Sequence, residues 1–528
     1  MAILASEVEL PGSVRVRRRV PRGLLVASCL VAALLLLPLA FLLLEARQVG
    51  WAQLFGLLFR QLTLTLLVNL VGLAVVVTAL AAGIGTGAAW LVERTDLPGR
   101  RLLALLLVLP LAVPDFVVAF GWVSLLPAVS GYGGAVLVMT AGLYPLVYLP
   151  VSASLRGADP TQEETARTLG LGPGRTFWRV TLRQVRPTIL AGCLLVSLAL
   201  LAEYGAFEIL GYQTFTTEIF TEFQVGFNAP AACALSLVVV LIGLLVLLGE
   251  GTLRDRGRMA RTAHNSRRAG PRLQLRRWRW PAVAALALVV AVALGMPIGV
   301  VLYWLVRGGS STLPQSASVG SAAGHTVLYS AAAAAIATIL ALPVALLACR
   351  SPERGVRLLE RSTYIVQGLP GLVIALALVF FALHYLPFVY QTSGLLIGAY
   401  AILFFPLAYV AVRASVLQAP VALEEVARSL GRSPWQVRWR VTLPLVAPGL
   451  AAAFCLVFLS AVTELTATLV LVPTGVQTLA TQFWAYTGNV SYGAAAPYAA
   501  AMVAISIVPG ILLGRWFDRR PAQLGAPR

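Results

Sequence analysis

The sequence has few charged residues and no lysine. Charged side chains make up 12% of its 528 residues, whereas 59% are hydrophobic and the mean hydropathy is +0.85. Soluble proteins carry about 25% charged residues, so this chain is expected to be an integral membrane protein. The net charge of +19 comes from arginine alone. Membrane proteins gather arginine in cytoplasmic loops, so we expect a lipid bilayer and no nucleic acid as partner.

Residue types that often carry chemistry are also scarce. The five cysteines lie in apolar runs without CxxC spacing, which indicates neither a disulfide framework nor a zinc site. The three histidines are scattered, and no catalytic constellation is visible. The GxxxxGK[ST] phosphate loop is absent, so ATP is not bound by that route. We expect no catalytic residue, no enzymatic activity and no cofactor; whether the chain binds a metal stays open.

The sequence consists mainly of long apolar runs. The first, 24–44, follows five arginines as in a signal peptide, but it is long enough to span a bilayer and no small-x-small cleavage site follows. We interpret it as an uncleaved first helix. With it there are about twelve spans, so the predicted fold is all-α. The other runs centre on 62–90, 102–124, 134–153, 188–210, 229–248, 281–306, 322–348, 363–386, 390–412, 448–472 and 493–514.

The distribution of arginine predicts the orientation. With the N-terminus inside, the cytoplasmic segments hold about 37 of the 40 arginines, and only Arg47, Arg60 and Arg307 lie outside. Such a bias predicts a multi-pass protein of the bacterial cytoplasmic (inner) membrane with both termini in the cytoplasm. The cytoplasmic segments are 1–23, 91–101, 154–187, 249–280, 349–362, 413–447 and 515–528.

One cytoplasmic loop is written twice. The stretch Glu163–Pro187 recurs as Glu424–Pro448 at a constant offset of 261, without a gap, and about 14 of 25 positions are identical. Two parallel six-helix halves are therefore expected, since an even number of spans puts both copies on one side. The predicted domains are 1–250 with the loop 154–187, a basic linker 251–280, and 281–528 with the loop 413–447.

Each copy is expected to form a short helix, a turn and a second helix that re-enters the membrane. Glu163 and Glu164 open the first helix, where carboxylates complement the helix dipole. Gly170 then permits a turn that a Cβ would hinder. A plain basic loop has no physical need to recur residue by residue, so we expect both copies to have the same kind of partner.

The repeated loop resembles the EAA signature of ABC-importer permeases: Glu, x, Ala, three residues, Gly, nine residues, an aliphatic residue, x, Leu, Pro. The second copy matches throughout, whereas Arg183 replaces the final proline of the first. The resemblance implies a type I importer permease with both transmembrane halves fused. It also implies a cytoplasmic ABC ATPase dimer and an extracytoplasmic solute-binding protein as partners. The residues it assigns to ATPase coupling are Glu163, Glu164, Ala166, Gly170 and Leu182 in the first copy, and Glu424, Glu425, Ala427, Gly431, Leu443 and Pro444 in the second.

Segments outside the loops resemble the ferric-iron branch of these permeases. They are Ala202–Phe220, Glu464–Trp484, Val113–Trp122 and Leu369–Leu378. The resemblance implies ferric iron as the substrate, with thiamine, polyamine and phosphonate importers as alternatives. Glu203 and its counterpart Glu464 are candidates for the substrate path, because a carboxylate at the edge of an apolar span is costly without a role. Hard cations favour such oxygen ligands, but contact with the binding protein is also open.

Two other classes of protein remain possible from the sequence. An ion-driven secondary transporter also has about twelve spans, although ionisable residues within the spans are few. A membrane scaffold could use the twin loops to recruit a dimeric partner, and it would transport no solute. Copurification of an ATP-hydrolysing subunit and solute flux in proteoliposomes would separate these classes.

Overall fold

A computed structural model describes residues 22–157, 161–258, 272–308, 316–350 and 354–519 of the chain. Within these ranges the regular structure is helical, which confirms the predicted all-α class. Nine described helices are long and apolar enough to cross a membrane, and a bent pair would make ten. Two further apolar helices, Gly371–Tyr385 and Tyr492–Ile507, are shorter. The number twelve therefore stays a prediction.

The first half contains the helices from α1 to α13. Its span 102–124 was expected to be one helix, but α4 and α5 are bent by 91° around Val113 and Pro114, since proline cannot continue the helical hydrogen bonding. The helices are α1 Arg22–Val49, α2 Trp51–Leu58, α3 Gln61–Arg94, α4 Arg100–Leu106, α5 Asp115–Leu125, α6 Gly131–Leu143, α7 Pro145–Gly157, α8 Thr161–Thr168, α9 Pro173–Thr176, α10 Leu182–Ala202, α11 Gly205–Ile209, α12 Phe215–Gln224 and α13 Ala229–Arg258.

The second half repeats this order with local differences. The expected span 363–386 is divided, because the α-helix ends at Ile365 and a new helix starts after Pro370. The helices are α14 Arg279–Val290, α15 Met296–Arg307, α16 Ser316–Arg350, α17 Arg354–Ile365, α18 Gly371–Tyr385, α19 Ser393–Gln418, α20 Val421–Ser429, α21 Pro434–Val437, α22 Leu443–Val462, α23 Thr466–Leu471, α24 Leu479–Gly488 and α25 Tyr492–Arg519.

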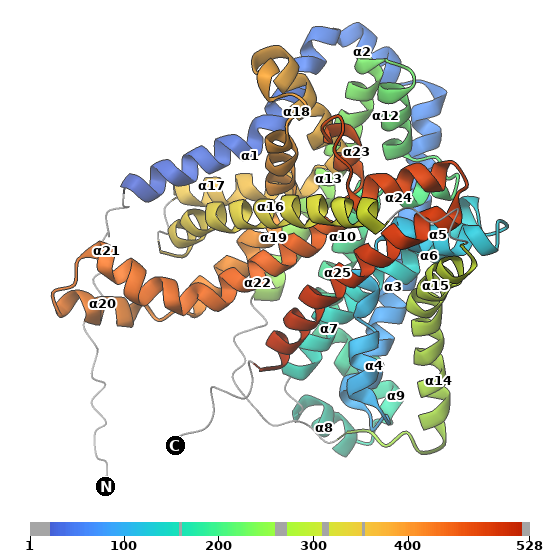
Figure 1. The fold of residues 1–528 in the computed structure, drawn as a ribbon. Helices are drawn as coiled ribbons and strands as arrows, with labels where there is room; N and C mark the ends of the chain where they lie inside the picture. Colours follow the sequence, from blue (N-terminus) through green and yellow to red (C-terminus); the bar gives the residue numbers. More distant parts are fainter. Residues whose placement is uncertain (1–21, 158–160, 259–271, 309–315, 351–353, 520–528) are drawn as a thin grey trace.

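The two halves exchange their first helices. α1 packs against α16, α17 and α18 of the second half, and α15 packs against α5 of the first half. Figure 1 shows α1 beside α17 and α18, whereas α14 and α15 lie on the other flank beside the first half. Each half therefore buries apolar surface on the other, and the halves are interlocked rather than laid side by side.

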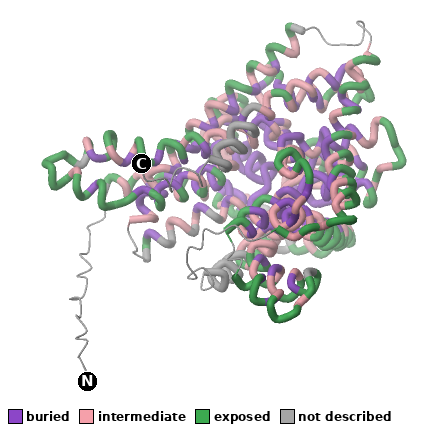
Figure 2. The backbone as a smooth tube through the Cα atoms, turned by 90° about the horizontal axis from the view of Figure 1, so that it is seen from below, coloured by how far each residue is buried: buried purple, intermediate pink, exposed green. Residues whose placement is uncertain are grey.

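The repeated loops lie at the ends of two diverging arms. α19 and α22 lead to α20 and α21 at one corner of the molecule, and α7 and α10 lead to α8 and α9 at another (Figure 1). In the view from below, the buried residues concentrate where the arms meet, and the arm that carries α20 is mostly exposed at its tip (Figure 2). The loops are thus held by the helix packing and remain free of the core.

A close approach of two glycines joins the halves near their centre. A Cβ on Gly243 of α13 would lie 2.2 Å from the carbonyl oxygen of Gly368, which precedes α18. The obstacle is backbone, so it cannot swing away. We expect Gly243→Ala to destabilise the permease by about 1–3 kcal/mol, the usual cost of overpacking. Thermal unfolding in detergent measures this.

Gly249→Ala is the matched control, because it lies on the same helix and nothing approaches its Cβ position within 4 Å. The control is expected to leave the unfolding temperature unchanged. Equal unfolding temperatures for the two variants would contradict the close approach.

Candidate functional site

The two copies of the repeated loop have the same backbone. α8 and α20 are each followed by a glycine turn, a short helix and a π-helical turn, Phe177–Thr181 in the first copy and Arg438–Thr442 in the second. The long helices α10 and α22 then return to the core. The expected helix, turn and re-entering helix are confirmed, and the π-helical turns, which sequence reasoning missed, also lie at the same offset of 261.

Gly170 and Gly431 occupy the left-handed region of the backbone. Their φ angles are +83° and +80°, and nothing lies within 4 Å of the Cβ position of either residue. Side chains rarely adopt this conformation. The glycines are therefore required by the turn, and a side chain placed there would project outward instead of clashing inside the loop.

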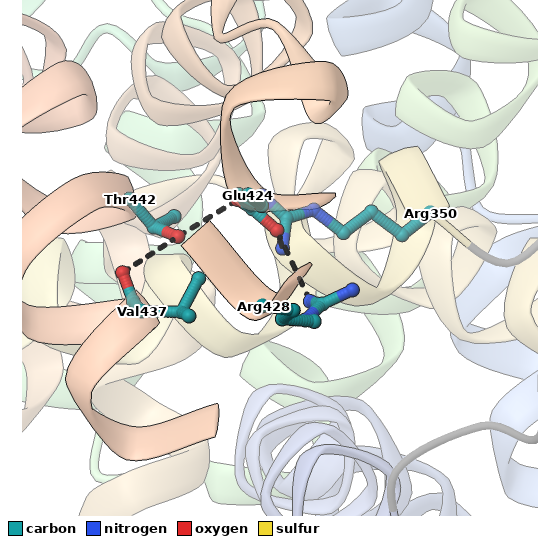
Figure 3. A network of polar contacts seen from close by, with 5 residues as sticks. All are labelled: Arg350, Glu424, Arg428, Val437 and Thr442. Atoms are coloured by element: carbon teal, nitrogen blue, oxygen red, sulfur yellow. Dashed lines mark hydrogen bonds and ion pairs between the residues drawn. The ribbon is translucent and has the colours of Figure 1, made fainter. Parts of the chain in front are cut away.

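Glu424 is the buried centre of the second loop (Figure 3). Its side chain is 3% exposed and accepts hydrogen bonds from Arg350 at 2.8 Å, from Thr442 at 2.7 Å and from Arg428 at 3.4 Å. Arg350 ends α16, and Thr442 closes the π-helical turn. One carboxylate therefore ties α20 to the end of a membrane-spanning helix and to the start of α22.

Glu163 makes the equivalent contacts in the first loop. It accepts a hydrogen bond from Thr181 at 3.0 Å, and its carboxylate lies 3.5 Å from Arg94, which ends α3. Arg167 approaches it at 3.8 Å. The first loop is therefore held more loosely than the second.

Glu163 and Glu424 are buried, so other residues form the surface of each loop. Glu164 and Glu425 are exposed, Ala166 is buried, and Ala427 is half-buried. The resemblance assigned Glu163 and Glu424 to ATPase coupling. In the structure both carboxylates face inward, where each is paired with an arginine as a buried charge requires. Leu182 and Leu443 are half-buried at the start of the re-entering helices, and Pro444 is exposed.

Large apolar side chains stand exposed on both loops. Leu169 is 78% exposed and its counterpart Leu430 is 76% exposed. Trp178 and Trp439 are a second equivalent pair, at 68% and 54%. The same large apolar residues are therefore exposed at equivalent positions of both loops.

The start of the second half is docked beside the first loop. Leu273 pairs with Thr95 in a short parallel bridge, and the carboxylate of Asp96 accepts a hydrogen bond from the Leu275 N–H at 2.9 Å and pairs with Arg279. The Leu275 N–H and then Arg279 lower the pKa of Asp96, so this contact is retained above the usual titration range of aspartate and is lost only as the pH falls through the lowered pKa. The linker expected at 251–280 is therefore anchored at its end, and residues 259–271 lie outside the described part.

Three carboxylates gather in a cavity between the halves. The cavity has a volume of about 310 Å³ and is lined by Asp115 of α5, Glu203 at the end of α10, and Glu464 at the end of α22. Among the described residues that line it, none is basic. We call it the carboxylate chamber. Its walls come from both halves, so a solute in it would lie between the moving parts.

Local backbone fixes the orientation of these carboxylates. Oε1 of Glu203 accepts from the Ala206 N–H at 2.7 Å, and Oε1 of Glu464 accepts from the Ala467 N–H at 3.0 Å. Each caps the short helix that follows it, and the match between the halves confirms that Glu203 and Glu464 are structural counterparts. Only Oε1 of each glutamate takes part in these two hydrogen bonds.

Asp115 belongs to the chamber but was not identified from the sequence. It follows Pro114 in a segment that was noted only for its resemblance to other permeases. Its carboxylate occupies the place of a missing side chain, since a Cβ on Gly142 would lie 2.1 Å from Oδ1. Asp115, Glu203 and Glu464 do not form a metal centre: in the described ranges, no three His, Cys, Asp or Glu side chains are grouped closely enough to hold an ion.

Comparisons with known proteins agree with this architecture. The family model described as "binding-protein-dependent transport system inner membrane component" matches twice, at residues 81–256 and 337–523. A Haemophilus influenzae protein, Fe(3+)-transport system permease protein FbpB 2, is 37% identical over 505 residues, which cover 94% of this chain and 99% of that protein.

Two relatives with other named substrates match a smaller part of the chain. The sulfate transport system permease protein CysT of Salmonella typhimurium is 32% identical over 43% of this chain and 89% of its own length. The molybdenum transport system permease protein ModB of Escherichia coli is 32% identical over 30% of this chain and 80% of its own length. With two family domains, a relative that matches nearly end to end and helices that can cross a bilayer many times, the chain belongs to the inner membrane components of binding-protein-dependent transport systems, the multi-pass permeases of ABC importers.

Proposed function

We propose that this permease imports ferric iron across the inner membrane, driven by a separate ATPase. The carboxylate chamber is the main support for a cationic substrate, because three acidic side chains line a cavity between the two halves. Ferric iron is a hard cation and prefers oxygen ligands. The near end-to-end similarity to an Fe(3+)-transport permease supports the same substrate class.

The two repeated loops would transmit the ATPase motion. Their exposed leucines, tryptophans and second glutamates, Glu164 and Glu425, form matching surfaces for the two subunits of a cytoplasmic dimer. The diverging arms would approach each other when that dimer closes on ATP (Figure 1). Because the arms are continuous with the helices around the chamber, this movement would alternate access to it from the two sides. The cation would arrive on an extracytoplasmic binding protein.

An oxyanion substrate is the second candidate, since relatives carry the names of sulfate and molybdenum systems. The chamber disfavours it. Sulfate or molybdate would face Asp115, Glu203 and Glu464 without an arginine among the described lining residues. Like charges in a cavity of low dielectric repel strongly. Uptake of either oxyanion by the wild-type protein would overturn the assignment of a cation.

The test is uptake of radioactive ferric iron by proteoliposomes that contain the permease, its ATPase and its binding protein. Asp115→Asn, Glu203→Gln and Glu464→Gln are each expected to lower the rate about tenfold or more, which corresponds to about 1.4 kcal/mol for the lost attraction of one carboxylate. Glu218→Gln is the matched control, because Glu218 lies on α12 outside the chamber. Full uptake by all three chamber variants would exclude the chamber from the path.

A further inference from the structure

A second cavity lies next to the carboxylate chamber, on the side away from the repeated loops. It has a volume of about 420 Å³, and both halves contribute to its walls. Along α5, Asp115 lines the carboxylate chamber and Ser124 lines the second cavity. Ser124 lies nine positions after Asp115 on the helix, about 13 Å at 1.5 Å per residue. We call this cavity the outer chamber, since α6 and α7 lead from this end of α5 back to the loop at α8.

Aromatic rings form a layer between the two chambers. Phe116 lines the carboxylate chamber and Phe120 lines the outer chamber. The ring of Phe483 lies 5.4 Å from that of Phe116 and 5.3 Å from that of Phe120. All three residues are at most 3% exposed. Rings packed at these centroid distances are in contact, so the layer narrows the way between the two chambers.

The ring layer joins the two halves. Phe116 and Phe120 belong to α5 of the first half, whereas Phe483 belongs to α24 of the second. Tyr204 of the first half continues the layer, with its ring 5.5 Å from that of Trp484. Separation of α5 from α24 would therefore open the layer. This is the type of movement that the arms would produce when the loops approach each other.

The polar groups of the outer chamber suit a hydrated cation. Glu208 is exposed and lines the chamber, and none of its described lining residues is basic. The buried hydroxyl oxygen of Thr487, which also lines it, has no hydrogen-bond partner among the described residues. One water molecule needs about 10–15 Å³ of cavity space, so a cavity of about 420 Å³ holds many. The space is sufficient for a metal ion that keeps its inner shell of water.

We propose that the outer chamber is a receiving site for a hydrated trivalent cation, which Glu208 attracts and the ring layer holds back from the carboxylate chamber. The inference rests on the proposed iron transport and adds an earlier site to it. The ion would move on to the carboxylate chamber only after α5 and α24 separate. The two chambers would therefore be filled in sequence.

Terbium luminescence tests the receiving site in the complete transporter, with ATPase subunits bound, in lipid nanodiscs. Tb³⁺ is a hard trivalent ion, and Tyr204 and Trp484 line the chamber and can sensitise its emission. We expect saturable emission that ferric nitrilotriacetate competes away. Glu208→Gln is expected to weaken Tb³⁺ binding about tenfold or more, and Glu218→Gln is the control that keeps wild-type affinity. Equal affinity for Glu208→Gln and wild type would overturn the proposal.

The ring layer is tested by passive leakage without ATP. Phe483→Ala is expected to let Tb³⁺ enter liposomes loaded with a chelator, whereas the wild type stays tight. Phe120→Leu, a smaller change in the same layer, should leak less and serves if Phe483→Ala fails to fold. If both variants fold and neither admits more Tb³⁺ than the wild type, the ring layer is not a barrier.

The outcome is distinguishable from failure of the proposed function. Wild-type proteoliposomes that bind Tb³⁺ through Glu208 but import no iron would refute iron transport and keep the receiving site. Normal iron uptake together with unchanged Tb³⁺ binding in Glu208→Gln would refute the receiving site alone.

Discussion

Replacing Gly431 with aspartate is expected to abolish ATP-driven uptake and to leave the permease folded in the membrane. The residue has φ of +80°, and nothing lies within 4 Å of its Cβ position. Aspartate tolerates the left-handed region better than most residues, so the loop should keep its shape. Its carboxylate would, however, project next to the exposed Leu430, where we expect the ATPase to bind. We expect uptake to fall at least about 100-fold, or about 2.7 kcal/mol.

Three measurements check this prediction: uptake, copurification of the ATPase subunits, and the elution profile of the permease in detergent. Gly475→Asp is the matched control, because Gly475 has φ of +84° and an equally open Cβ position, but lies between α23 and α24 at the other end of the molecule. The control should retain the ATPase. ATP-driven uptake at the wild-type rate in Gly431→Asp would refute the assignment of this turn to coupling.

Glu424→Gln is expected to destabilise the permease by about 3 kcal/mol, which is the low end of the cost of breaking a buried ion pair. The glutamate is 3% exposed, and its loss leaves Arg350 without a counter-charge. Arg350 is 27% exposed, so water relieves part of the cost. The loop helix α20 would then separate from the end of α16. Thermal unfolding should show a lower midpoint, and uptake should fall with it.

Two variants separate the effect of the buried network from that of the loop surface. Glu163→Gln should also destabilise the permease, because Arg94 lies 3.5 Å from its carboxylate and is only 12% exposed. Glu425→Gln changes the exposed neighbour and should lower the unfolding midpoint less than Glu424→Gln does, while weakening ATPase binding. A midpoint for Glu424→Gln equal to that of Glu425→Gln would show that the network contributes no stability.

The helical class and the twin loops could be predicted from the sequence because they depend on local properties. Apolar runs of sufficient length form helices in lipid, since the backbone must satisfy its own hydrogen bonds. The glycine at each turn and the constant offset of 261 then fix the loops. The direction of the side chains could not be predicted. Glu424 and Glu425 are neighbours of one residue type, and the fold places Arg350 and Thr442 beside the one that is buried.

The contacts between the halves could not be predicted from the sequence. Transmembrane helices are apolar all round, so periodicity does not indicate which face meets which partner, and the exchange of α1 and α15 leaves no pattern. Asp115 was missed for a related reason. No sequence motif marks a single carboxylate after a proline. Its role depends on Gly142, Glu203 and Glu464, which only the fold brings close to it.

The exchanged first helix has a consequence for biosynthesis. α1 ends at residue 49, but α16, the first of the second-half helices that it packs against, begins at residue 316. The ribosome needs about 15–50 s to make the residues between them, at 5–20 residues per second. During that time α1 lacks its described contacts with α16, α17 and α18, and it packs against α2 and α13 of the first half. The first half therefore cannot complete its packing while it is being synthesised. Its first helix must stay in the membrane without these partners until the second half has been inserted.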